Sequence, residues 1–289
     1  MVYNKRWTMR DGLTREIQLV ILDIFKSVAN IIEKYNLRYF AIGGTCLGAV
    51  RHQGFIPWDD DMDIAMPNKD YQRFIEIAPD VLPNNLKLVL PGHDAHYNNL
   101  SLRVQNIDTT FIEDHVIGLE DRYMGVWLDI MPLYGVPSKY SEQCSYAKKI
   151  AFYRKLNHKR KMPFKTCNTL KSKGMFLLSL PLNVFLDNNY WLRKWEKLVS
   201  KYDFDKSEYT GYVWWDQLNK LIFPIEWFEN YVYLKFEDTY IRCPKKYDKF
   251  LTQMFGDYMQ LPPANERYTH SGKEAIIDLN HSYTYYMKK

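Results

Sequence analysis

The spacing of apolar residues predicts a long helix near the start of the chain, followed by strands. From Leu13 to Tyr35 apolar side chains recur every three or four residues, the period of a helix with one buried face. Asp11 can cap its first turn. The further elements predicted for this half are strands at 38–42, 62–66, 86–90, 101–105 and 125–130 and a helix at 69–77. Residues 1–137 are therefore expected to form a mixed sheet with helices.

The second half of the chain has a different pattern. Residues 138–215 are mostly helical in pattern, with no internal repeat. Aromatic-rich alternation within 223–241 predicts a hairpin, and 245–255 predicts a helix that ends at Gly256. We therefore expect an α+β protein with a core at 1–137, a helical segment at 138–215 and a C-terminal segment at 216–289.

Composition narrows the class of protein. Of the 289 residues 46% are hydrophobic, which is ample for a buried core. The four cysteines are scattered without a C-x-x-C spacing, so neither a zinc site nor a disulfide framework is expected, and reduced thiols in the cytoplasm are the simpler expectation. The N-terminus lacks the apolar core of a signal peptide. No apolar run reaches the roughly 18 residues needed to span a membrane.

Positive charge is concentrated in one window. The net charge is +5, yet residues 143–186 contain no Asp or Glu, and ten Lys or Arg lie between Lys148 and Lys173. An apolar stretch, 175–186, follows. A basic run beside an apolar helix is typical of peripheral contact with an anionic membrane, here the inner face of the plasma membrane. The alternatives are a surface for polyanions and a buried helix beside a solvated one. Nucleic acid is not expected, because no nucleic-acid-binding motif accompanies the run.

Several carboxylates gather around the second strand. Side chains alternate along a strand, so Asp61 and Asp63 should point the same way, about 7 Å apart. Asp59 would share that face if the strand starts early, and Asp60 would point elsewhere. Acidic runs are often solvated loops, but here Trp58, Met62, Ile64 and Met66 interleave with the acids. Clustered oxygens suit a hard divalent cation, so we expect Asp61 and Asp63 to bind Mg²⁺ or Mn²⁺.

The glycine pair Gly43-Gly44 lies between the two first strands. Thr45–Val50, which follows it, can open a helix whose free N–H groups would face a phosphate. An ordinary tight turn is the alternative. Arg51 and His52 lie between the glycines and the acids, where a phosphate contact and a surface role are equally compatible with the spacing.

The residues from Gly43 to Ile64, GGTCLGAVRHQGFIPWDDDMDI, resemble the signature of the LicD family of phosphocholine transferases and fukutin-related proteins. Val126–Leu133 resembles the second acidic strand of that family, and Tyr247–Pro263 resembles its C-terminal motif, which would complete the active site. The resemblance spans 42–263, although about 140–215 matches no motif. It implies a nucleotidyltransferase-like fold.

The resemblance also implies a reaction. A CDP-alcohol, most plausibly CDP-choline, would donate its phospho-alcohol to a sugar hydroxyl of a cell-surface polysaccharide or lipid-linked oligosaccharide precursor, and CMP would leave. Glycerol phosphate or ribitol phosphate could replace phosphocholine. A nucleotidyltransferase that attaches the nucleotide monophosphate would use the same carboxylates. A non-enzymatic membrane-associated assembly factor is a third alternative, which the intact acids disfavour.

Asp129 is expected to be the third carboxylate of the site. It lies on a strand of its own among apolar neighbours, where a carboxylate needs a partner or a metal. The alternatives are an ion pair with Arg103 and a role as acceptor of the hydroxyl proton. The substrate would contact Gly43, Gly44, Thr45, Arg51, His52 and Trp58. A quaternary ammonium would need an aromatic box, for which the candidates are Trp58, Trp127, Trp214, Trp215 and Tyr258. His270 is a candidate contact or an exposed residue.

Overall fold

In the computed structural model the chain forms two compact units. The first comprises 1–89, 102–132 and 226–289, and the second comprises 90–101 and 133–225. The structure describes residues 12–92, 99–113, 124–161, 169–170, 173–174, 176–177, 185–214, 217–218, 221–269 and 275–287. Asp11, Trp215, His270 and much of the apolar stretch 175–186 lie outside these ranges.

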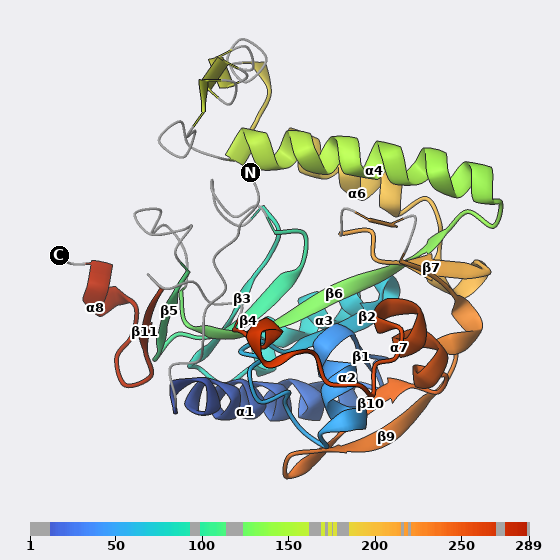
Figure 1. The fold of residues 1–289 in the computed structure, drawn as a ribbon. Coiled ribbons are helices and arrows are strands. Elements are labelled where there is room, and N and C mark those ends of the chain that lie inside the picture. Colours follow the sequence, from blue (N-terminus) through green and yellow to red (C-terminus); the bar gives the residue numbers. More distant parts are fainter. Residues whose placement is uncertain are drawn as a thin grey trace. The chain divides into compact units, whose positions relative to one another are not determined.

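A sheet flanked by helices forms the first unit (Figure 1). Its helices are α1 (Leu13–Lys34), α2 (Gly43–Arg51), α3 (Asn68–Val81), α7 (Tyr247–Phe255) and α8 (Thr284–Met287), with 3₁₀ turns at Ile225–Trp227 and Ala264–Glu266. Its strands are β1 (Phe40–Ala41), β2 (Asp63–Pro67), β3 (Leu86–Val89), β4 (Leu102–Asn106), β5 (Thr110–Ile112), the start of β6 (Val126–Val136), β9 (Tyr231–Phe236), β10 (Thr239–Pro244) and β11 (Ile276–Asp278).

The order of strands in the main sheet places β2 and β6 side by side. The order is β1-β2-β6-β4-β3, with antiparallel pairing of β1 to β2, β6 to β4 and β4 to β3. The backbone N–H of Asp129 in β6 donates to the carbonyl of Met62, at 3.1 Å. The two acidic segments that are separate in the sequence are therefore neighbours in the fold.

The predicted helices are confirmed where the structure describes them. α1 buries Ile17, Ile21, Phe25, Val28 and Ile32, the positions that the period of three to four residues selects. α7 ends at Gly256, whose φ of 69° lies in the left-handed region, as the C-terminal glycine predicts. Each large apolar side chain buried in this way stabilises the fold by about 1.5–3 kcal/mol.

Several expected boundaries differ in the structure, among them those of the strand expected at 125–130, which as β6 spans Val126–Val136, and of the helix expected at 69–77, which as α3 spans Asn68–Val81. The strand expected at 38–42 is only Phe40–Ala41, because the chain turns into α2 directly after Ile42. The strand expected from Met62 begins at Asp63. The helix α2 begins at Gly43, so the glycines form its first turn and do not precede it. β9 and β10 form the expected hairpin, from Tyr231 to Pro244.

α2 packs against β2, α7 and the β9–β10 hairpin. The contact with β10 brings Cys46 and Cys243 into a hydrogen bond between two buried thiols. Burial raises the pKa of the Cys46 thiol well above its usual range, and the bond to Cys243 adds to the increase. Together with Cys144, these are free cysteines within the described residues.

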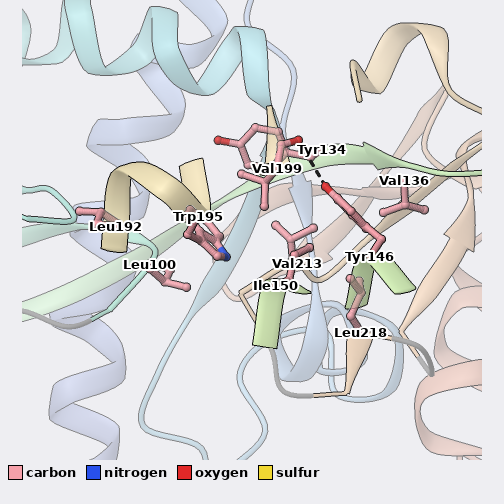
Figure 2. Close-up of a cluster of buried hydrophobic side chains, with 10 residues drawn as sticks. All are labelled: Leu100, Tyr134, Val136, Tyr146, Ile150, Leu192, Trp195, Val199, Val213 and Leu218. Carbon is pink, nitrogen blue, oxygen red and sulfur yellow. Dashed lines mark hydrogen bonds between the residues drawn. The ribbon is translucent and has the colours of Figure 1, made fainter. Parts of the chain in front are cut away.

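The second unit is built around the remainder of β6. It contains α4 (Tyr140–Lys161), α6 (Tyr190–Val199), β7 (Tyr209–Gly211), β8 (Ile222–Pro224) and a 3₁₀ turn at Phe204–Lys206. β7 pairs with the last residues of β6 and with β8. α4 and α6 lie side by side (Figure 1). Their facing side chains, with residues of β6, make the buried cluster in Figure 2, in which the Tyr146 hydroxyl donates to the Val199 carbonyl at 3.4 Å.

Candidate active site

The acids of the sequence motif lie in a loop that leads into β2. We call residues 56–63 the acid loop. Asp59 and Asp60 are buried, with exposed fractions of 9% and 3%, and Asp61 and Asp63 are partly buried. The loop therefore is not the solvated acidic run that composition alone would allow.

The charges of this loop converge on Asp61. Burial raises the pKa of Asp61 well above its usual range, and the neighbouring charges of Asp59, Asp63, Asp60 and Asp129 raise it further, in that order. Strand alternation cannot explain this convergence, because Asp61 precedes the strand and Asp60 also takes part. Asp63 on β2 and Asp129 on β6 thus lie on neighbouring strands, and both are near enough for their charges to act on Asp61.

The first turn of α2 lies against the acid loop. Gly43 has a φ of 53°, in the left-handed region that favours glycine. A Cβ atom on Gly44 would lie 2.5 Å from Oδ2 of Asp59, and one on Gly43 would lie 3.9 Å from Oδ2 of Asp63. Gly44 therefore allows the Asp59 carboxylate to approach the positive end of the helix dipole, which stabilises negative charge there, whereas a Cβ on Gly43 would only be in ordinary contact with Asp63. A phosphate contact of Gly43 and Gly44 stays a prediction.

Thr45 fixes the start of β2. Its Oγ1 accepts a hydrogen bond from the backbone N–H of Asp63 at 2.8 Å, and the residue is buried. Thr45, in the first turn of α2, thus positions Asp63 at the start of β2. The contact of Thr45 with substrate stays a prediction.

Asp129 has a cationic partner. Arg103 donates through Nε to Oδ1 of Asp129 at 3.2 Å, and its Nη1 binds Glu113 at 3.0 Å. Trp127 donates from its indole N–H to Oδ2 of Asp129 at 2.7 Å, and the Arg103 guanidinium lies 3.9 Å from the centre of the Trp127 ring. The ion pair with Arg103 that we left open is therefore present. A role for Asp129 as metal ligand or proton acceptor stays a prediction.

A buried glutamine of α1 holds the acid loop in place. The side-chain amide of Gln18 donates to the carbonyl oxygens of Ile56 at 3.1 Å and of Asp59 at 2.7 Å, and only 2% of the residue is exposed. Sequence reasoning missed Gln18. One sequence feature could have revealed it: Gln18 is a polar residue on the face of α1 that the apolar positions Ile17 and Ile21 mark as buried. A buried amide needs hydrogen-bond partners.

The tip of the β9–β10 hairpin holds the segment before the acid loop. Glu237 accepts from the backbone N–H of Phe55 at 3.0 Å and forms two hydrogen bonds with Arg15, at 2.9 and 2.6 Å. Its own N–H donates to the carbonyl of Gln53 at 2.8 Å. The bond to Arg15 lowers the pKa of Glu237. We call these contacts the hairpin clasp, and no pattern in the sequence predicted them.

The described aromatic residues that were predicted as candidates for a quaternary-ammonium box already contact other side chains. The ring of Trp58 has the Arg267 guanidinium 5.1 Å from its centre, and Trp127 carries Arg103 as described. The Tyr258 hydroxyl binds Asp248 at 2.7 Å. Trp214, in the second unit, stacks on Tyr212 at 4.7 Å. The aromatic box therefore stays a prediction, and a second cation would have to approach Trp58 and Trp127 on a face that arginine does not cover.

The carboxylate oxygens of Asp61 and Asp63 are ligands of the kind that a hard divalent cation prefers. Asp61 and Asp63 offer hard oxygen ligands, and the repulsion that raises the pKa of Asp61 is what a cation would relieve. In the described part of the chain no three Asp, Glu, His or Cys side chains form a ready-made metal cage. Mg²⁺ commonly binds one or two carboxylates and completes its shell with water and substrate phosphates, so this set fits Mg²⁺.

Comparison with known proteins identifies the family. The sequence model described as LicD/FKTN/FKRP, nucleotidyltransferase domain, matches residues 36–169. The lipopolysaccharide cholinephosphotransferase LicD of Haemophilus influenzae is 30% identical over 291 residues, covering 93% of this chain and 100% of that protein. The chain belongs to the LicD family. Ribitol 5-phosphate transferase FKRP of Homo sapiens matches this LicD-family chain locally, at 33% identity over 69 residues, 24% of this chain and 13% of that protein.

Membership of the LicD family confirms the resemblance found in the sequence motifs and the predicted α+β, nucleotidyltransferase-like fold class. The matched range, 36–169, contains the glycine turn, the acid loop and Asp129. It contains neither Gln18 nor Glu237, which hold the acid loop from both sides of that range.

Proposed function

We propose that this protein is a phosphotransferase that moves a phospho-alcohol, phosphocholine in the first instance, from a CDP-alcohol to a sugar hydroxyl of a cell-surface glycan or lipid-linked precursor. The convergence of acidic side chains on Asp61 is the observation that carries this proposal. Two relatives support the reaction class, because one is a cholinephosphotransferase and the other a ribitol 5-phosphate transferase.

The roles of the residues follow from their positions. Asp61 and Asp63 would hold Mg²⁺ or Mn²⁺, which when bound neutralises charge on the donor's phosphates. Asp129 is the third carboxylate, as ligand or as acceptor of the hydroxyl proton. Gln18, Thr45 and the hairpin clasp would keep the acid loop in one geometry. In the reaction the acceptor oxygen bonds to the phosphorus that carries choline, the bond from that phosphorus to CMP breaks, and the hydroxyl proton is taken up by the base.

A panel of CDP-alcohols tests this proposal. With Mg²⁺ and a glycan acceptor, CDP-choline, CDP-glycerol and CDP-ribitol are each incubated with the protein, and CMP release and labelled product are measured. We expect CMP release to be fastest with CDP-choline, and label in the choline phosphate to appear on the acceptor. Label from the CMP half on the acceptor would instead establish a nucleotidyltransferase. No release from any donor, with or without acceptor, would contradict the proposal.

We further propose that the second unit contacts an anionic membrane through α4. Lys148, Phe152, Lys155 and Lys159 recur at helical spacing and are exposed, while Ile150 on the opposite face is buried. A basic helix of this kind gains about 1 kcal/mol per Lys or Arg at an anionic surface. None of the helices in the described part of the chain combines the length and apolar character needed to cross a bilayer.

Vesicle co-sedimentation tests the membrane proposal. We expect binding to vesicles that contain phosphatidylglycerol, weakened by salt, and no binding to phosphatidylcholine alone. Substituting Lys148, Lys155 and Lys159 with Gln should reduce the bound fraction severalfold. A matched variant that removes the same charge from the exposed lysines of the other unit, Lys235, Lys246 and Lys249, should bind normally. Equal loss in both variants would contradict a specific role of α4.

A further inference from the structure

Two arginines of the first unit are near enough for their charges to interact, and neither pairs with a carboxylate among the residues that the structure describes. Arg51 ends α2, and Arg267 follows the 3₁₀ turn after α7. Burial lowers the pKa of Arg51, and the positive charge of Arg267 lowers it further. Within the residues that the structure describes, neither guanidinium forms an ion pair with a carboxylate. We call Arg51 and Arg267 the arginine pair.

Backbone carbonyls, which carry no net charge, hold the arginine pair in position. Nη1 of Arg51 donates to the carbonyls of Tyr258 at 2.7 Å and Gln260 at 3.3 Å, and Nε of Arg267 donates to Pro262 at 3.0 Å. A guanidinium has five N–H donors in a fixed plane. In the described part of the structure no hydrogen bond uses Nη2 of Arg51 or either Nη of Arg267. Each guanidinium is therefore held by uncharged groups and keeps N–H donors that no hydrogen bond uses within the described residues.

Aromatic rings connect the arginine pair to the acid loop. Trp58, directly before Asp59, carries the guanidinium of Arg267 over its ring. The ring of His52 meets Trp58 edge to face at 6.1 Å, and Nδ1 of His52 lies 3.5 Å from Nε of Arg51. Burial and the charge of Arg51 lower the pKa of His52, so this ring is neutral at pH 7 and does not add a third cation.

We propose that the arginine pair binds a phosphate group. Two guanidiniums at close range repel each other, and an anion between them replaces that repulsion with charge-assisted hydrogen bonds of the bidentate kind that arginine makes to phosphate. The pair is next to the acid loop through Trp58, so the phosphate belongs to a substrate of that site. The identity of this substrate rests on the proposed function: it is either the diphosphate of the donor or a phosphate carried by the acceptor.

Calorimetric binding of inorganic pyrophosphate, without divalent cation, tests the site itself. We expect the substitution Arg267→Gln to weaken binding about tenfold or more, the loss typical of a charge-assisted contact. Arg267→Lys, which keeps the charge, should retain part of the affinity. Arg73→Gln removes one positive charge from an exposed position of the same unit and should bind as the unaltered protein does. Thermal unfolding checks that each variant is folded. Unchanged pyrophosphate affinity in folded Arg267→Gln would overturn the proposal.

The same variants identify the source of the phosphate. If Arg267→Gln also weakens CDP-choline, and pyrophosphate competes with CDP-choline, the pair binds the donor. If CDP-choline affinity is unchanged and pyrophosphate binds alongside it, the pair binds the acceptor's phosphate. Both outcomes support the site. Loss of pyrophosphate binding in Arg267→Gln, in a protein that turns over no CDP-alcohol, would sustain the phosphate site while the proposed function fails.

Discussion

Replacing Asp61 with asparagine should abolish phospho-alcohol transfer without reducing the stability of the fold. The carboxylate would be lost as a metal ligand, and a metal contributes several kcal/mol to the transition state, so the rate should fall by about 10³-fold or more. The same change removes a charge that Asp59, Asp63, Asp60 and Asp129 repel. The free energy of unfolding, measured in urea without divalent cation, should therefore stay constant or rise.

The exposed Asp80 on α3 provides the control for this substitution. Asp80→Asn changes the net charge equally and should leave CMP release and unfolding unaltered. If the activity of Asp61→Asn were within tenfold of that of the unaltered protein, Asp61 would not be part of the catalytic site. A loss of several kcal/mol in its unfolding free energy would show that the carboxylate has a stabilising partner, contrary to the repulsion described above.

Replacing Arg103 with leucine should be the most destabilising single change in the site. The side chains of Arg103 and Asp129 are only 9% and 12% exposed, so the substitution would leave a buried carboxylate without its partner. Removing one member of a buried ion pair typically costs about 3–5 kcal/mol. Glu113 would lose its ion pair with Arg103, and Trp127 its stacked guanidinium, in the same step. Urea unfolding measures the loss.

A double-mutant cycle separates the ion pair from other effects of Arg103. Adding Asp129→Asn to Arg103→Leu removes the charge that has lost Arg103, so the double variant should lose less stability than the sum of the two single losses, with a coupling energy of about 0.5–3 kcal/mol. Arg73→Gln serves again as the exposed control, because exposed ion pairs contribute only about 0–1 kcal/mol. If the loss of unfolding free energy in the double variant equalled the sum of the losses in the two single variants, Asp129 would not depend on Arg103.

Elements with a local signal could be predicted from the sequence. The apolar period of α1, the alternation in β9 and β10 and the glycine after α7 each lie within the element that they specify. The pairing of β5 with β11 could not be predicted, because Ile112 and Ile276 meet only through the tertiary fold. The same holds for β2, whose start at Asp63 is set by the hydrogen bond to Thr45.

Part of the candidate site could likewise be predicted from the sequence, and part could not. Its carboxylates are adjacent in the sequence or lie in a clear apolar setting, so Asp61, Asp63 and Asp129 could be named in advance. The ion pair of Asp129 with Arg103 could be given only as an alternative, since apolar surroundings require a partner without identifying it. Gln18 and Glu237 act on backbone groups of distant residues, and such contacts leave almost no trace in a linear pattern.

The hairpin clasp has a consequence for how the protein matures during translation. A nascent chain that has reached residue 169 already carries every carboxylate of the acid loop, yet Glu237 is still to be synthesised. The segment around Phe55 then lacks its contacts with Glu237, although Gln18 and Thr45 are already present to bind the acid loop. The segment before the acid loop consequently gains its full set of contacts only after the β9–β10 hairpin has been synthesised, and a polypeptide that stops before Glu237 would contain Asp61, Asp63 and Asp129 without the hairpin clasp.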